Sequence, residues 1–141
     1  MLRFMKGEGV EDLTMISSMS NGAIVSNLQQ RLTREEIYTA LGDVLISVNP
    51  YKKLEIYGPD IIAMYKSAKT SSNTAPHIFG TAQRSYSNLV EDNHSQSIII
   101  SGESGAGKTV AAKFLLQYFV AVSPSKAGSS SSSSSSSGGG G

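Results

Sequence analysis

The chain has 141 residues, a formal net charge of +1 and no cysteine. Because the charge is nearly balanced, we expect no general attraction to nucleic acid or to an anionic membrane. The lack of cysteine excludes a disulfide framework and a thiolate metal site. No stretch is apolar enough for a signal peptide or a bilayer span, so we expect a soluble intracellular protein without a transmembrane segment.

Residues 9–32 predict two helical pieces that face the core. Residues 20–22, Ser-Asn-Gly, form a break between them and a possible N-cap for the second piece. In the second piece we expect Gln29, Gln30 and Arg31 to face water. The apolar residues at helical spacing are Val10, Leu13 and Ile16, followed by Ile24, Leu28 and Leu32.

Residues 33–48 predict a β-hairpin. Residues 33–36 have the form of a capping box, which would begin a helix instead. However, residues 37–39, Ile-Tyr-Thr, favour a pleated strand, and Gly42-Asp43 is a two-residue turn signal, so the hairpin is preferred. Its second strand, residues 44–48, stops at Asn49-Pro50 because proline cannot donate to a central ladder.

The middle of the chain predicts two further helices and no catalytic pair. Gly58-Pro59 opens the first helix, and the second covers residues 82–90. His77 and His94 have no metal-ligand partner at helical spacing, and His77 is interpreted as a packing residue. The neighbouring acids Glu91-Asp92 are interpreted as solvated loop residues.

The strongest motif is a phosphate-binding loop. The sequence Gly-Glu-Ser-Gly-Ala-Gly-Lys-Thr fits the template GxxxxGK[ST], in which glycines let backbone N–H groups surround a phosphate. We expect Lys108 to reach the β- and γ-phosphates and Thr109 to bind Mg²⁺ through its hydroxyl. The expected loop residues are Gly102, Glu103, Ser104, Gly105, Ala106, Gly107, Lys108 and Thr109.

A strand and a helix are expected on the two sides of this loop. Residues 98–100, all Ile, predict a strand that is buried on both faces. The helix that follows the loop is apolar on nearly every side, which predicts burial on nearly every side. A chain of this length can hardly supply so many neighbours for one helix.

Residues 49–57, Asn-Pro-Tyr-Lys-Lys-Leu-Glu-Ile-Tyr, resemble the purine-binding loop of the myosin motor domain. Residues 102–109 match the myosin form of the phosphate loop, and residues 76–79, Pro-His-Ile-Phe, resemble a third myosin segment. The resemblance covers residues 9 to about 123 and is strongest to class I myosins. On the residues alone, Asn-Pro is a turn and Tyr57 an ordinary buried aromatic. The adenine-pocket residues that the resemblance implies are Asn49, Pro50 and Tyr57, with Lys52 alongside them.

The resemblance implies an α/β fold, namely the N-terminal portion of a myosin motor domain, a P-loop NTPase with an incomplete central sheet. In the family, the strands that flank the phosphate-loop strand come from later segments, so an unpaired strand edge is expected here. The implied divisions are an N-terminal extension at 1–8, the motor-domain part at 9–123, and a flexible Ser/Gly-rich tail at 124–141. The chain reads as a motor domain truncated after the phosphate-loop helix.

The resemblance also implies ATP and Mg²⁺ as cofactors, the actin filament as the family's partner, and a cytoplasmic location at the actin cytoskeleton. In the family, two loops needed for hydrolysis and the actin-binding surfaces come after residue 123, so the expected function is the ATP-binding fragment of an actin-based motor. One alternative is a nucleotide-binding module without ATPase or actin-binding activity. Another is a small P-loop nucleoside kinase, which would need an acidic base and an arginine-bearing lid after the loop helix.

Overall fold

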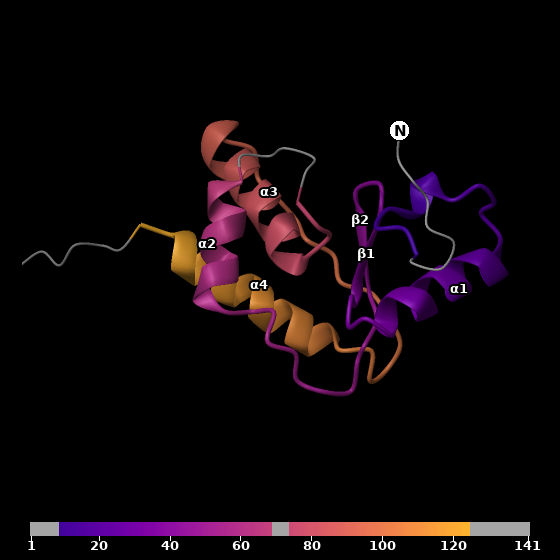
Figure 1. Cartoon of the computed structure of the whole chain (residues 1–141). Helices are drawn as coiled ribbons and strands as arrows, with labels where there is room; N and C mark the ends of the chain where they lie inside the picture. Colours follow the sequence, from indigo (N-terminus) through magenta and orange to yellow (C-terminus); the bar gives the residue numbers. More distant parts are fainter. Residues whose placement is uncertain (1–8, 69–73, 125–141) are drawn as a thin grey trace, which may run out of the picture.

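The computed structural model describes residues 9–68 and 74–124 (Figure 1). The expected extension at 1–8 and the tail, apart from Pro124, lie outside this part of the chain. The described segment is a small assembly of helices with one antiparallel hairpin. Its elements are a 3-10 turn at Leu13–Met15, α1 at Asn21–Leu32, β1 at Tyr38–Leu41, β2 at Val44–Ser47, α2 at Pro59–Ser67, α3 at Ile78–Glu91 and α4 at Lys108–Val122.

Helices α2, α3 and α4 gather on one side of the hairpin, and α1 lies on the other (Figure 1). Helix α3 packs against α4, and α2 contacts both. The centre of this packing is Phe79 of α3 and Tyr118 of α4, which are both fully buried. The Tyr118 hydroxyl donates to Gln83 Oε1 at 2.6 Å, so the most buried phenol of the core has a polar partner.

Residues 9–17 contain only a 3-10 turn, so the first predicted helical piece is largely wrong. The Asp12 side chain accepts from the Thr14 backbone N–H and from its hydroxyl, which fixes a tight turn. In addition, the Glu11 carbonyl accepts from the Ala40 N–H at 2.8 Å. Because that carbonyl pairs with β1, it is not available for a helix.

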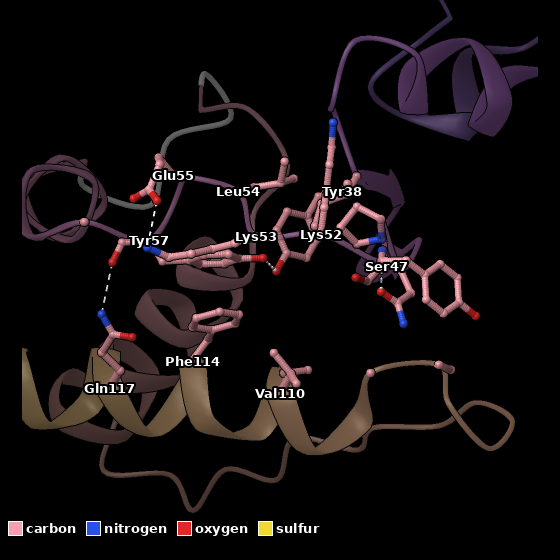
Figure 2. A pocket seen from close by; sticks show the side chains of 18 residues that line it. Tyr38, Ser47, Lys52, Lys53, Leu54, Glu55, Tyr57, Val110, Phe114 and Gln117 are labelled. Atoms are coloured by element: carbon pink, nitrogen blue, oxygen red, sulfur yellow. Dashed lines mark hydrogen bonds and ion pairs between the residues drawn. The ribbon is translucent and has the colours of Figure 1, made fainter.

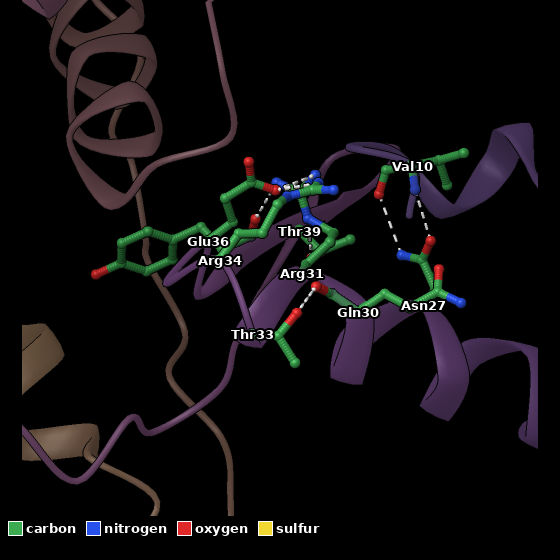
Figure 3. Close-up of polar contacts among 9 residues, drawn as sticks. Val10, Asn27, Gln30, Arg31, Thr33, Arg34, Glu36 and Thr39 are labelled. Carbon is green, nitrogen blue, oxygen red and sulfur yellow. Dashed lines mark hydrogen bonds and ion pairs between the residues drawn. The ribbon is translucent and has the colours of Figure 1, made fainter. Parts of the chain in front are cut away.

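Helix α1 begins where the sequence predicted, since the Ser20 side chain caps it by accepting from the Ala23 N–H at 3.2 Å. The buried Asn27 side chain forms two hydrogen bonds with the backbone of Val10 (Figure 3). The predicted break and the second helical piece are therefore confirmed. The Asn27 amide ties the helix to the preceding segment, whereas the apolar residues predicted to face the core, Ile24, Leu28 and Leu32, are only partly buried.

The prediction that Arg31 faces water is wrong, because its exposed fraction is only 3%. Its Nε donates to Thr39 Oγ1 and its Nη2 to the Tyr38 carbonyl, both at 3.0 Å, while Nη1 pairs with Glu36 at 3.2 Å (Figure 3). Buried oxygens on β1 need donors, and the guanidinium supplies several in one plane. The last turn of α1 is thus joined to the first strand.

The predicted hairpin is confirmed, with Tyr38 opposite Ser47 and Leu41 opposite Val44. Gly42 has a φ of 57°, the left-handed conformation that a two-residue turn requires. Strand β2 ends at Ser47, one residue earlier than predicted, although the Val48 N–H still bonds to the Ile37 carbonyl at 2.9 Å.

The prediction of a buried strand at residues 98–100 is wrong. These residues form no strand, and Ile99 is 90% exposed. Within the described residues the sheet contains only β1 and β2, so no neighbouring strand reaches this segment. An extended segment without a neighbour on either side cannot satisfy its backbone groups by strand pairing.

Helix α4 is not buried on all sides, which corrects the prediction from its apolar sequence. Leu115, Tyr118 and Val122 face the core, whereas Leu116 and Val120 are 63% and 79% exposed. The expected shortage of neighbours is therefore observed. The described residues cover one face of the helix and leave another apolar face open.

The other two helices, α2 and α3, were both predicted from the sequence. Helix α2 begins directly after Gly58, with Pro59 in its first turn, as predicted. Helix α3 begins at Ile78, earlier than the predicted residue 82, because the His77 ring caps it. Glu91 ends this helix, and Glu91, Asp92 and His94 are all exposed, consistent with their interpretation as solvated residues.

Candidate functional site

The glycine loop stands immediately before α4. Gly105 and Gly107 have φ values of 80° and 96°, which side chains with a Cβ rarely adopt, and no heavy atom lies within 4 Å of a Cβ built at either position. The backbone is therefore both turned and open at these points. The loop leads directly into the N-terminus of a 15-residue helix, whose free N–H groups favour an anion.

Lys108, the first residue of α4, folds back over this loop. Its Nζ donates to the carbonyls of Gly102 and Glu103, both at 2.7 Å. The ammonium is thus held among backbone groups by two charge-assisted hydrogen bonds. Thr109 follows on the first turn of the helix and is exposed. A cation and a hydroxyl therefore stand together at the start of α4.

A cavity of about 680 Å³ lies between the 49–58 segment and α4 (Figure 2). All four residues predicted for the base pocket line it, and the glycine loop contributes Ala106 and Gly107. The opposite wall belongs to α4 and consists of Val110, Ala111, Phe114 and Gln117. The two motifs, about 50 residues apart in sequence, therefore border one cavity.

Asn49 joins the two motifs directly. Its Nδ2 donates to the Gly105 carbonyl at 2.9 Å, and its Oδ1 accepts from the Tyr51 N–H at 2.9 Å. The amide is therefore engaged within the protein at both ends. It holds the 49–58 segment against the glycine loop, as well as lining the cavity beside Pro50.

Lys52 lies at the rim of the cavity and forms an ion pair with Glu35. Both side chains are more than half exposed, so the pair contributes little to stability. Glu35 has a φ of 65°, and its carboxylate reaches the rim from the turn that follows α1. Lys52 therefore lies beside the cavity and has a partner that the sequence did not indicate.

A ring stack and two hydrogen bonds hold Tyr57 in the wall of the cavity (Figure 2). Its ring stacks on Phe114, with centroids 3.5 Å apart and planes 10° apart. Its carbonyl accepts from Gln117 Nε2 at 3.0 Å, and its hydroxyl lies 2.8 Å from the Tyr38 hydroxyl. Burial raises the pKa of both phenols, so both stay neutral at pH 7.

Sequence reasoning gave no role at this cavity to several of its lining residues, among them Tyr38, Val110, Phe114 and Gln117. The last three recur at intervals of four and three residues, so they share one face of a helix that starts at the glycine loop. That spacing could have indicated them. Tyr38 gave no such signal, because its hydroxyl reaches the cavity only through the packing of the hairpin.

His77 is a packing residue, as predicted, and also a helix cap. Its Nδ1 accepts from the Phe79 N–H, and its Nε2 lies 3.0 Å from the Ile56 carbonyl, which requires the proton on Nε2. The ring is surrounded by the aromatic rings of Tyr38, Tyr57, Tyr65 and Phe79. Burial lowers the pKa of His77 to about 4, against a weaker opposing effect of its bond to Ile56.

Stability is therefore expected to fall in mild acid. Because the folded pKa of His77 is about 4 and the ordinary value is 6.5, the unfolded chain binds the proton more tightly between these values. The contribution of neutral His77 to the free energy of unfolding is fully present above about pH 6.5, and about 3 kcal/mol of it is lost as the pH falls to about 4. Urea unfolding at pH 7 and pH 4.5 measures this loss. His77→Gln should make the free energy of unfolding less dependent on pH. An equal loss of stability in the variant and in the unchanged chain would contradict the assignment of this loss to His77.

Among residues 9–68 and 74–124, no group of three or more His, Cys, Asp or Glu side chains is placed to hold a metal ion. In the same residues, no helix has the length and apolar character needed to cross a membrane.

The site combines a glycine loop at the start of a helix with an adjoining cavity, and comparison with known proteins identifies the family. The model of the myosin head (motor domain) family matches residues 10–137. The chain therefore belongs to the myosin head (motor domain) family. This assignment sets aside the nucleoside-kinase alternative.

Known relatives agree with this assignment. The chain is 52% identical to Myosin-K heavy chain of Dictyostelium discoideum over 119 residues, which cover 84% of this chain and 14% of that protein. It is 43% identical to Myosin IC heavy chain of the same organism, over 89% of this chain and 11% of that protein. Myosin-1 of Mycosarcoma maydis is 50% identical over 82% of this chain and 9% of its own length. The chain thus spans about one seventh or less of each relative, and two of the names support the resemblance to class I myosins.

Proposed function

We propose that this chain binds Mg·ATP as the nucleotide-binding part of an actin-based motor. The observation that carries the proposal is the hydrogen bond from Asn49 to Gly105, which holds the purine loop against the phosphate loop at one cavity. The triphosphate would lie on residues 102–109, with Lys108 neutralising part of its charge. The base would enter the cavity, where Pro50 and Tyr57 present flat apolar surfaces.

Mg²⁺ fits these residues as an ion held mainly by the nucleotide. Thr109 offers one hydroxyl oxygen next to Lys108, and Mg²⁺ commonly combines few protein ligands with phosphate oxygens and water. When bound, the ion would neutralise phosphate charge. The residues of this chain bind and orient the nucleotide, and they exclude water from the face of the base that packs on the cavity wall.

A role in a motor is inferred from the family. Relatives that match this chain are named myosins, and we infer that the nucleotide site serves movement along actin in the cytoplasm. The proposal assigns binding and orientation to the described residues. Hydrolysis would also need groups that place the attacking water and stabilise the transferred charge. The alternative of a stand-alone nucleotide-binding module is less favoured, because the family match extends over most of the chain.

Equilibrium titration of the full chain with a fluorescent ATP analogue tests the proposal, with and without Mg²⁺. We expect saturable binding that Mg²⁺ strengthens, in a chain that shows a cooperative melt by circular dichroism. Thr109→Ala should remove most of the Mg²⁺ effect while keeping the weaker metal-free binding. A cooperatively folded chain without saturable binding would overturn the proposal.

A further inference from the structure

We propose that Tyr38 is a positioning residue of the base pocket, whose hydroxyl holds that of Tyr57 and so fixes the Tyr57 ring where a purine would bind. The inference rests on the proposed nucleotide function. It assigns a role to a residue that lies outside both sequence motifs, on the first strand of the hairpin.

The Tyr38 phenol is itself held rigidly. Tyr38 is 5% exposed, and its ring meets the His77 ring edge-on, with centroids 4.9 Å apart and planes at 67°. His77 is fixed in turn by hydrogen bonds at both ring nitrogens. The backbone carbonyl of Tyr38 is bonded to buried Arg31. The hydroxyl that reaches the cavity is therefore carried on a well-anchored side chain.

Three of the contacts that hold Tyr57 come from two parts of the fold, in addition to the contacts of its ring with His77 and Phe79. Helix α4 supplies the stacking partner Phe114 and the amide of Gln117, and strand β1 supplies the Tyr38 hydroxyl. Phe114 and Gln117 locate the ring face and the backbone, whereas only the Tyr38 hydroxyl locates the phenol tip among these three. Removing it would leave the ring packed on Phe114, His77 and Phe79 but without a hydrogen bond at its tip. A pocket wall that is fixed before binding costs less to order when the ligand arrives.

The hydroxyl pair also has a polar group to offer. Either oxygen can be the donor in the 2.8 Å contact, and that contact uses one of the two hydroxyl protons. Held in this way, the Tyr57 hydroxyl keeps a proton or lone pairs for the cavity that both residues line. The edge of a base carries ring nitrogens and exocyclic groups that can pair with this hydroxyl. Tyr38 would thus act on the base through Tyr57, and not on the phosphates.

The test compares two ligands in the full chain, Mg·ATP and Mg·tripolyphosphate, which lacks the base and the sugar. Tyr38→Phe should weaken Mg·ATP binding by roughly 2- to 10-fold, the effect of one hydrogen bond. It should leave the tripolyphosphate affinity unchanged. Tyr65→Phe is the matched control, because Tyr65 is also buried but its hydroxyl donates to the Ala75 carbonyl, away from this cavity. We expect the control to change neither affinity.

A second variant tests the pairing itself. In a Tyr57→Phe background the hydroxyl pair is already broken, so adding Tyr38→Phe should have no further effect on Mg·ATP affinity. The role of Tyr38 would be overturned if Tyr38→Phe lowered the affinity for both ligands equally or lowered neither. It would also be overturned if the two substitutions lowered the Mg·ATP affinity additively in the double variant. If the unchanged chain binds tripolyphosphate but not ATP, the proposed base pocket and the role of Tyr38 are both overturned, while the phosphate site stands. If it binds neither ligand, the proposed function itself is overturned.

Discussion

Replacing Lys108 by alanine is expected to weaken Mg·ATP binding by roughly 100-fold or more, since charge-assisted hydrogen bonds are each worth about 1.5–3 kcal/mol. The Lys108 ammonium stands at the N-terminus of α4 and is held by the carbonyls of Gly102 and Glu103. A triphosphate on the loop would take this cation as its counter-charge. Titration with the fluorescent ATP analogue measures the loss.

Lys113→Ala is the matched control for this change. Lys113 lies on the same helix and is exposed, and it does not line a second cavity beside the loop, which Lys108 lines together with Gly102 and Gly107. Its removal should alter affinity by less than about twofold, through the weak screening-sensitive effect of a surface charge. If Lys108→Ala bound Mg·ATP as tightly as Lys113→Ala, the phosphate-loop assignment would fail.

Phe79→Ala is expected to destabilise the fold by about 3–5 kcal/mol. Phe79 is fully buried and its ring contacts those of Tyr57, His77 and Tyr118, at centroid distances of 6.0, 4.8 and 5.3 Å. Alanine would lose these contacts and leave a cavity between α3 and α4. A small domain has a total stability of only about 5–15 kcal/mol, so the variant should be close to unfolding.

Urea unfolding followed by circular dichroism checks this expectation. The control is Val90→Ala on the same helix, where the side chain is 61% exposed and the change should stay within about 0.5 kcal/mol. Equal unfolding midpoints for the two variants would show that Phe79 is not at the centre of the core. A change in the urea dependence itself would indicate that the chain does not unfold in a single step.

Local signals predicted the elements that depend on neighbouring residues. Gly42-Asp43 specified the hairpin, Ser20 capped α1, and Gly58-Pro59 began α2, each through a conformation or a hydrogen bond within a few residues. The glycine loop was likewise evident from its spacing. These features depend on backbone geometry that a short stretch of sequence determines by itself.

Features that depend on distant partners were not predictable in this way. Arg31 looked like a solvent-facing residue of a helix until β1 placed buried oxygens beside it. Residues 98–100 have the composition of a buried strand, yet strand formation needs neighbours that the described residues do not supply. The contribution of Tyr38 to the pocket is tertiary too, because its hydroxyl reaches the cavity through the packing of the hairpin.

The measurement that tests the central claim most directly is an amide NMR titration of the full ¹⁵N-labelled chain with Mg²⁺ and a non-hydrolysable ATP analogue. One shared site predicts that the amides of Gly105 and Gly107 and those of Tyr51 and Tyr57 shift together, with one common affinity. Shifts of the loop glycines alone, or different affinities for the two segments, would contradict a single site that joins the phosphate loop to the base pocket.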